Sequence, residues 1–378
     1  MTAPPDRVVI VGGGLAGHTA AATLRSQGFH GAVTLLTQES AHPYDRPPLS
    51  KELLLDSKFQ PMLGPDLADL DIRVHTETAA VAIRAGEIHT ASATFPFDAA
   101  VLAPGLRARN LPGAPQAMVL RDIEDAIRLR AELRPDRSVL IAGAGLIGSE
   151  VATAAAALGC CVTVVSPEFG PAMPGIPNEV LAQIRGWYDE CGIELVTGVR
   201  AMETSAAGVL FSDSSVRAAD LVIAAIGGVP ATSWLTDAVE VDRRGFIVAD
   251  EYLRTTLPGV YAVGDAVSWR SKRYGGETHL EHWQHAAESG QAAARNILGD
   301  NEIYDPLPYF WSHQLGHSLH YVGRHDPDDH CAIEPDPRSG RAVTWTRDGR
   351  PTAVLAIDAA HLVRRARTAI DTKASVAR

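Results

Sequence analysis

The fold of this chain is decided by R-V-V-I-V-G-G-G-L-A-G, residues 7–17. Four β-branched residues lead directly into the spacing Gly12-x-Gly14-x-x-Gly17, and an Ala-rich stretch of helical composition follows over residues 15–27. This order predicts a strand, a tight turn and a helix. The turn would hold the glycine backbone and the helix N-terminus against a pyrophosphate, which is the geometry of a dinucleotide site.

A second glycine motif stands at residues 139–148, V-L-I-A-G-A-G-L-I-G, with Gly143, Gly145 and Gly148 at the same spacing. It also lies between an apolar strand and an Ala-rich helical stretch, residues 150–158. One such motif is weak evidence for a nucleotide site. Two motifs, each in strand-to-helix context, predict two dinucleotide-binding folds and therefore two dinucleotides.

The composition limits the class of protein. A length of 378 residues, 46% of them hydrophobic, predicts two or three domains with an ample core. The net charge of −11 argues against a nucleic-acid binder or a protein of anionic membranes, since either needs a positive field. No secretion signal is visible, and the longest weakly polar stretch is too short to span a membrane. The four cysteines lack the spacing of a disulfide framework or a zinc site. We therefore expect a cytoplasmic protein with free cysteines.

The remaining chain predicts a repeated α/β organisation. Strands are expected at residues 32–37 and 99–105 for the first fold, with side-sheet strands over residues 71–84 and 87–97. The second fold would use residues 161–165 and 219–228, helices at 121–133 and 181–191, and a side sheet at 194–211. Residues 260–264 return to the first sheet, so the second fold is inserted in the first. The predicted domains are 1–105 with 226–306, 106–225, and a small α+β domain at 307–378.

Candidate nucleotide contacts follow the glycine motifs. Gln38 and Glu39 stand roughly 20 residues after the first motif, where an acid usually binds an adenosine ribose. In the second fold Ser166 takes that position, and Glu168 is the nearby acid. No Arg or Lys occurs between Ser166 and Arg185 to receive a 2′-phosphate, which favours NADH over NADPH.

A stiff loop over residues 42–52 contains three prolines and presents Arg46 and Lys51. Two cations on a rigid loop near a phosphate site indicate cofactor contact; the alternative is a solvent-facing loop with incidental charge.

Five segments together resemble one family. They are residues 7–17, P-Y-D-R-P-P-L-S-K at 43–51, G-A-G-L-I-G-S-E at 143–150, T-T-L-P-G-V-Y-A-V-G-D at 255–265 and P-Y-F-W-S-H-Q at 308–314. The chain resembles the FAD-dependent NAD(P)H:ferredoxin reductases of the putidaredoxin reductase group, which serve Rieske oxygenases and haem-thiolate monooxygenases. The resemblance implies a glutathione-reductase-like architecture, bound FAD, NADH as co-substrate, and a ferredoxin that receives single electrons after a hydride has reached FAD.

The resemblance also implies roles for residues at matching positions. Lys51 would lie beside the flavin ring and pair with Glu150, whose carboxylate would point at the nicotinamide and place charge there without acting as a nucleophile. The FAD pyrophosphate would be cradled by Gly12, Gly14, Ala16 and Gly17. Other FAD contacts would come from the Ala80 backbone, Arg121, Asp265 on the ribityl chain and Trp283 at the flavin edge.

The chain departs from the family at several positions. Gln38 stands where Asp is frequent, Ala103-Pro104-Gly105 replaces A-T-G, and W-S-H-Q at 311–314 replaces W-S-D-Q. The ferredoxin is expected near a basic cluster and two further residues: Arg270, Lys272, Arg273, His279 and Trp311. For the basic cluster the alternative is ordinary solvent-exposed surface, and for Trp311 it is plain packing inside the last domain.

Two other functions stay open at this point: an NADH oxidase or small-molecule reductase, and a flavin redox sensor resembling apoptosis-inducing factor. Disulfide reductase chemistry is disfavoured because residues 15–27 and the loop after Tyr44 contain no cysteine. His279, His282 and His285 could share a helix face, yet without a cysteine or carboxylate set we expect no metal site.

Overall fold

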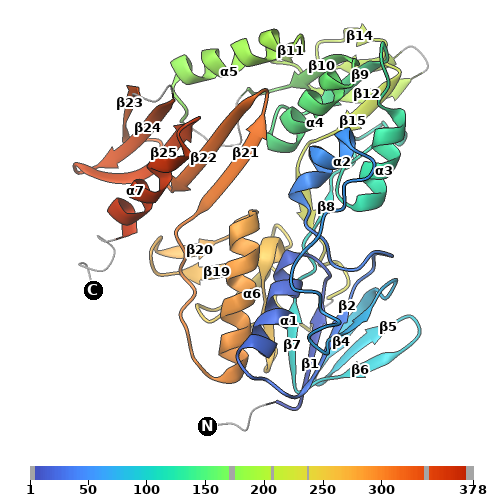
Figure 1. Ribbon diagram of the computed structural model, residues 1–378, viewed down its shortest axis with the longest axis vertical. Coiled ribbons are helices and arrows are strands. Elements are labelled where there is room, and N and C mark those ends of the chain that lie inside the picture. Colours follow the sequence, from blue (N-terminus) through green and yellow to red (C-terminus); the bar gives the residue numbers. More distant parts are fainter. Residues whose placement is uncertain (1–4, 170–174, 206–207, 236–237, 336–339, 372–378) are drawn as a thin grey trace. The chain divides into compact units, whose positions relative to one another are not determined.

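The computed structural model describes residues 5–169, 175–205, 208–235, 238–335 and 340–371 (Figure 1). The chain divides into two compact units. The first comprises Met1–Arg46, Pro61–Arg107 and Val229–Pro306, and the second comprises Pro47–Gln60, Ala108–Gly228 and Leu307–Arg378. The assignment of three domains with the boundaries given above stays a prediction.

The first unit is built on a five-stranded parallel sheet. Its strand order is β18-β7-β1-β2-β3, and every neighbouring pair is parallel. The strands are β1 (Arg7–Val11), β2 (Ala32–Leu36), β3 (Arg73–His75), β7 (Ala99–Leu102) and β18 (Val260–Ala262). Helices α1 (Leu15–Ser26) and α6 (Trp283–Leu298) lie side by side in Figure 1. The predicted strand, turn and helix are confirmed, and β18 returns to the first sheet as expected.

Two small sheets complete the first unit. One is the antiparallel meander of β4 (Ala80–Arg84), β5 (Glu87–Thr90) and β6 (Thr94–Pro96); the other joins β17 (Ile247–Ala249), β19 (Val267–Ser271) and β20 (Gly276–Thr278). The expectation that residues 71–84 all belong to a side sheet is wrong for β3, which pairs with β2 from Thr34↔Arg73 to Leu36↔His75. Since β3 is a short edge strand with two exposed residues, its pattern imitates that of an antiparallel strand.

The second unit repeats this plan. Its parallel sheet has the order β11-β10-β9-β15, with β9 (Ser138–Ala142), β10 (Cys161–Ser166), β11 (Glu194–Thr197) and β15 (Leu221–Ala224). The helices here are η1 (Pro47–Ser50), α2 (Glu52–Leu55), α3 (Ile123–Glu132), α4 (Leu146–Ala157) and α5 (Asn178–Glu190). The side sheet contains β12 (Ala201–Ser205), β13 (Gly208–Phe211) and β14 (Val216–Arg217). The predicted side sheet at 194–211 is therefore wrong for β11, which joins the parallel sheet at its edge. Strands β8 (Leu106–Ala108) and β16 (Gly228–Pro230) carry the chain from one unit to the other and back.

The end of the chain adds an antiparallel sheet to the second unit, in the order β21-β22-β25-β24-β23. Its strands are β21 (Tyr309–Gln314), β22 (His317–Gly323), β23 (His330–Pro335), β24 (Arg341–Arg347) and β25 (Arg350–Ile357). Helix α7 (Ala360–Asp371) packs on this sheet through the buried Val363 and Ala366 (Figure 1).

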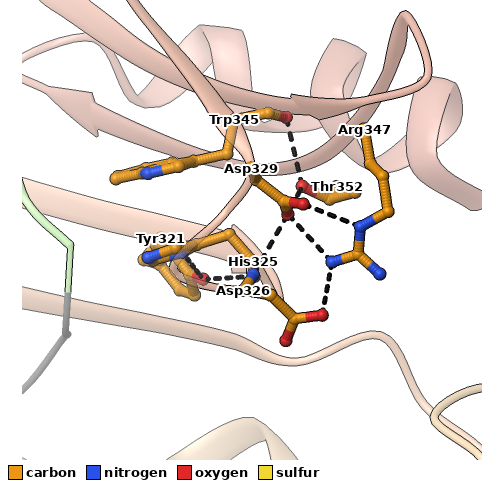
Figure 2. Close-up of polar contacts among 7 residues, drawn as sticks. All are labelled: Tyr321, His325, Asp326, Asp329, Trp345, Arg347 and Thr352. Carbon is orange, nitrogen blue, oxygen red and sulfur yellow. Dashed lines mark hydrogen bonds and ion pairs between the residues drawn. The ribbon is translucent and has the colours of Figure 1, made fainter.

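A polar network around the buried Asp329 fixes the turn between β22 and β23 (Figure 2). The Asp329 side chain is 1% exposed and accepts hydrogen bonds from Arg347 Nε and Thr352 Oγ1, each at 2.7 Å. The hydrogen bond from Arg347 lowers the pKa of Asp329 to about 2. His325 stacks on Trp345 with ring centroids 4.1 Å apart. The network stabilises the sheet on which β21 is held.

Two expectations about composition can be compared with the structure. All four cysteines are free, as expected. In the part of the chain that the structure describes, no helix combines the length and the apolar character that crossing a bilayer requires.

Candidate functional site

The first glycine loop is fixed by close packing at two positions and open at the third. Gly12 has a φ of +119°, and a Cβ there would overlap the carbonyl oxygen of Ala103. A Cβ on Gly17 would overlap the carbonyl oxygen of Gly12, so helix α1 approaches the turn closely. At Gly14 the nearest atom to an added Cβ is Arg46 Nε, 3.8 Å away. The loop therefore presents open backbone and the N-terminus of α1 beside a guanidinium, which fits a pyrophosphate.

The second glycine loop has the same construction. Gly143 has a φ of +114°, and a Cβ there would overlap the carbonyl oxygen of Ala225; Gly148 packs in the same way on Gly143. An added Cβ on Gly145 would find no described atom within 4 Å. Gly145 is the N-cap of α4 and makes no side-chain capping bond, so the first amides of the helix point to the open side. These residues fit a second dinucleotide.

Beside the first loop, Glu39 binds two neighbours with its two carboxylate oxygens. Tyr44 donates its hydroxyl hydrogen to Oε2 and Arg46 Nη2 donates to Oε1, each at 2.5 Å. Burial opposes the charge of Arg46, but Tyr44, Glu39 and Asp265 raise the pKa of its guanidinium above the ordinary value. Gln38, the other candidate, is exposed. The structure thus places a permanent cation at the open face of Gly14.

Asp265 lies in the short helix η2 (Gly264–Ala266), whose first residue is held by α6. The Gly264 amide donates to Ser289 Oγ at 3.0 Å, and its carbonyl lies 3.2 Å from His285 Nε2. His285 Nδ1 lies 2.7 Å from the Tyr304 hydroxyl. Burial lowers the pKa of His285 to about 3, so the ring is neutral. Hydrogen bonds on both sides of Gly264 therefore fix the position of Asp265.

The idea that three histidines share a helix face is wrong. Helix α6 begins at Trp283, so His282 is its N-cap in an extended conformation and His279 precedes the helix. Among the described residues, no group of three or more His, Cys, Asp or Glu side chains could hold a metal ion. Trp283, at the start of α6, is 39% exposed and donates from Nε1 to Asp45 Oδ1 at 2.7 Å.

The second unit contains a buried ion pair. Glu150, in helix α4, has a side chain that is 9% exposed, and its Oε2 lies 2.8 Å from Lys51 Nζ. The Ser50 hydroxyl donates to the same oxygen, and the Ser312 hydroxyl donates to Oε1 at 2.6 Å. Segment η1 and strand β21 both pack on α4, which explains how residues so distant in sequence meet. The predicted pairing of Lys51 with Glu150 is present.

Ser50 and Ser312 were not identified from the sequence. Ser50 is adjacent to Lys51 in a segment chosen for its cations, and Ser312 lies 162 residues from the carboxylate that it binds. Their positions within P-P-L-S-K and W-S-H-Q were the available signal.

The other predicted cofactor residues occupy varied positions. Ala16 is buried in α1, and Ala80 begins strand β4. The Arg121 amide donates to Asp125 Oδ2 at 2.9 Å, directly before α3. Ser166 is buried at the end of β10, and Glu168 is exposed two residues later. Their assignment to FAD and NADH stays a prediction.

The candidate docking residues fall in both units. In the first unit Arg270 is exposed, Lys272 Nζ lies 3.6 Å from Glu251 Oε1, and the Arg273 amide donates to Asp305 at 2.7 Å. His279 Nδ1 lies 2.7 Å from Arg244 Nη2. In the second unit Trp311 is half-buried and stacks on Tyr309, with ring centroids 5.9 Å apart.

Comparison with known proteins identifies the family of this chain. The pyridine nucleotide-disulphide oxidoreductase family matches residues 6–290, and the reductase C-terminal family matches residues 309–378. The ferredoxin–NAD(+) reductase subunit of the benzene 1,2-dioxygenase system of Pseudomonas putida is 33% identical, over 94% of this chain and 90% of its own length. The crystal structure of Fdr9 superimposes with a TM-score of 0.91 at 38% identity, covering 97% of this chain and 95% of Fdr9. Putidaredoxin reductase, in its covalent complex with putidaredoxin, gives a TM-score of 0.89 at 29% identity, covering 97% and 93% of the two chains. The chain therefore belongs to the pyridine nucleotide-disulphide oxidoreductase family and ends in a domain of the reductase C-terminal family.

Proposed function

We propose that this protein is an FAD-dependent NADH:ferredoxin reductase that supplies electrons to a monooxygenase or a Rieske oxygenase. The observation that carries the proposal is the buried pair of Lys51 and Glu150 in a chain with two dinucleotide loops. The relatives support it, because they are named ferredoxin–NAD(+) reductase components of dioxygenase systems.

The first loop is proposed to hold FAD. Arg46 would bind the pyrophosphate beside Gly14, and the Asp265 carboxylate would bind the ribityl chain from a turn that His285 and Ser289 hold. Bound FAD supplies the step between a two-electron donor and a one-electron acceptor. The protein contributes binding, orientation and charge.

The second loop is proposed to hold NADH. Lys51 and Glu150 form an ion pair with no net charge, and this pair would orient the nicotinamide. Glu168 is the acid available for the adenosine ribose, because Ser166 is buried. We expect kcat/KM to be at least tenfold higher with NADH than with NADPH, since a 2′-phosphate would meet the Glu168 carboxylate and no Arg or Lys occurs between Ser166 and Arg185. A preference for NADPH would contradict this assignment of Ser166 and Glu168.

The partner is proposed to be an iron–sulfur ferredoxin. Trp311 in the second unit and the basic residues Arg270, Lys272 and Arg273 in the first are the candidates for contact with it, together with His279. A local basic cluster can attract an acidic partner despite a net charge of −11, because charges more than about 10 Å away are largely screened at ordinary salt. The expected cytoplasmic location stays a prediction; free cysteines are compatible with it.

The test is NADH-driven reduction of cytochrome c by the purified flavoprotein, with and without an added [2Fe–2S] ferredoxin such as putidaredoxin, with oxygen uptake followed in parallel. A rate that requires the ferredoxin supports the proposal. Rapid oxygen uptake without ferredoxin would instead indicate an oxidase. Slow turnover in every mixture, with a long-lived reduced flavin and a change of oligomeric state, would indicate a redox sensor.

A further inference from the structure

We propose that Ser312 and Ser50 are positioning residues for Glu150. Their hydroxyl groups fix both oxygens of the carboxylate, so that one acceptor position on Oε1 is left for a hydrogen-bond donor on the nicotinamide, its carboxamide N–H. The inference rests on the proposed function, because it assigns NADH to the second glycine loop.

The hydrogen bonds around Glu150 account for most of its acceptor capacity. A carboxylate oxygen has about two acceptor positions. Oε2 receives the Lys51 ammonium at 2.8 Å and the Ser50 hydroxyl, whereas Oε1 receives the Ser312 hydroxyl at 2.6 Å. Ser50, Glu150 and Ser312 are 5%, 7% and 1% exposed. Among the described contacts, one position on Oε1 is therefore left.

The hydroxyls matter because a carboxylate at the end of a Glu side chain turns easily. The terminal torsion of Glu is broad and roughly two-fold, so Lys51 alone would accept either oxygen of Glu150. Two hydroxyl groups on opposite oxygens select one orientation. They are also neutral donors, so they hold the carboxylate without adding charge near the nicotinamide.

Ser312 is held by backbone and not by a flexible loop. It lies in β21, paired with Leu319 of β22. Three residues further along the chain, the Leu315 amide donates to Thr153 Oγ1 at 2.8 Å, on the α4 turn that follows Glu150. Two contacts therefore join α4 to this segment: Ser312 of β21 contacts a carboxylate, and Leu315, directly after β21, contacts a hydroxyl. The position of the Ser312 hydroxyl is set by the same helix that carries Glu150.

The strand also separates this role from docking. Successive side chains of a strand point to opposite faces, so Ser312 faces α4 while Trp311 and His313 face away. Exposure follows this alternation, since Ser312 is buried and His313 is exposed. A change at Ser312 should thus alter nicotinamide binding and leave the candidate ferredoxin contact in place.

The experiment compares Ser312→Ala, Ser50→Ala and Ser312→Thr with the FAD-loaded wild type. NAD⁺ binding to the oxidised protein is measured by titration calorimetry, and flavin reduction by NADH in a single turnover. We expect Ser312→Ala to weaken NAD⁺ binding and to slow flavin reduction. The product of the two losses should be about tenfold, which corresponds to one hydrogen bond to a charged group. Ser50→Ala should slow reduction similarly, and Ser312→Thr should remain within about threefold of wild type because the hydroxyl is kept.

The matched control is Ser318→Ala, on the adjacent strand β22. Its hydroxyl donates to Asp358 Oδ1 at 3.3 Å, and no described hydrogen bond joins it to Glu150, so binding and reduction should be unchanged. Melting temperatures of all variants show whether a loss reflects the fold. If the Thr variant is as impaired as the Ala variant, the packing of Ser312 and not its hydroxyl is important, and the proposal is wrong.

A double-mutant cycle tests whether Ser312 acts through Glu150. In a Glu150→Gln background, Ser312→Ala should cause less than a twofold further loss of NAD⁺ affinity, because the charge that the hydroxyl orients is gone. Losses that multiply would overturn the proposal, as would wild-type binding by both Ala variants. Failure of the proposed function looks different: the wild-type flavin would be reduced by dithionite but not by NADH.

Discussion

Replacing Arg46 by Met should weaken FAD binding, because it removes a fixed cation from the first glycine loop. The guanidinium lies at the open face of Gly14, with Nε 3.8 Å from the position of an added Cβ. It also neutralises Glu39 at 2.5 Å. The substitution removes the cation beside the proposed pyrophosphate and leaves two acids, Glu39 and Asp265, near it.

The magnitude follows from the strength of a charge-assisted hydrogen bond. Such a bond contributes about 1.5–3 kcal/mol. A quarter of the Arg46 side chain is exposed, so we take the lower half of that range. A loss of about 1.5–2 kcal/mol corresponds to an increase of about 10- to 30-fold in the Kd for FAD. Arg46→Lys keeps the charge but loses the planar fork, so an increase of about threefold to tenfold is expected.

The assay is reconstitution of the apoprotein, followed by quenching of flavin fluorescence. Arg73→Met is the matched control, because it removes the same charge from an exposed position on β3. Circular dichroism of each apoprotein shows whether the variant folds. A Kd for Arg46→Met within twofold of wild type, or equal to that of the control, would refute the assignment of Arg46 to the pyrophosphate.

Three further predictions follow from other parts of the structure. Because burial lowers the pKa of His285 to about 3 from 6.5, acid protonates the unfolded chain first, and stability should fall by about 2 kcal/mol between pH 6.5 and pH 5. His285→Phe should reduce this dependence in urea unfolding by about that amount, with the remainder coming from His282, whose pKa burial lowers to about 4; an equal slope in both proteins would contradict the prediction. Asp329→Asn should lower the free energy of unfolding by about 1–2 kcal/mol at pH 7, and this difference from wild type should diminish as the pH falls from about 4 through the native pKa of about 2. A difference in unfolding free energy that does not change with pH would refute the role of the Asp329 charge. Arg270→Glu should raise the KM for an acidic ferredoxin severalfold at low salt and flatten its salt dependence, leaving flavin reduction by NADH unchanged; an unaltered salt profile would remove Arg270 from the docking surface.

The parallel sheets could be predicted where strands are buried on both sides. Strands β1, β7, β9 and β15 are continuous apolar runs, and the glycine motifs identify the turns that follow β1 and β9. The two strands that were assigned wrongly, β3 and β11, lie at corresponding edges of the two sheets. An edge strand has one neighbour and more exposed residues, so its pattern does not reveal whether that neighbour is parallel. Both edge strands, β3 and β11, were predicted to lie in side sheets because the second unit repeats the fold of the first.

The candidate site was predictable where its residues are close in sequence. Arg46 and Lys51 share one proline-rich loop, and Glu150 follows a glycine motif. Ser312 meets Glu150 only because β21 packs on α4, which no local pattern encodes. The prediction that His279, His282 and His285 share a helix face is wrong because α6 begins after His282. A spacing of three residues places side chains on one face only inside a helix.

The two glycine loops differ in the charge that stands beside them, and this difference matches the two kinds of nucleotide. Gly14 has the Arg46 guanidinium at its open side, whereas Gly145 has no described atom within 4 Å of an added Cβ. A fixed cation adds binding energy to every pyrophosphate that enters, which suits a cofactor that must stay through many turnovers. A loop with no described cation within 4 Å of its central glycine should bind a pyrophosphate more weakly, as suits a co-substrate that must leave after each reduction. In Arg46→Met the protein should therefore lose FAD more readily, while its affinity for NAD⁺ should stay the same because the change lies at the first loop. We therefore expect the asymmetry of the two loops to favour retention of FAD and release of the nicotinamide nucleotide after each turnover.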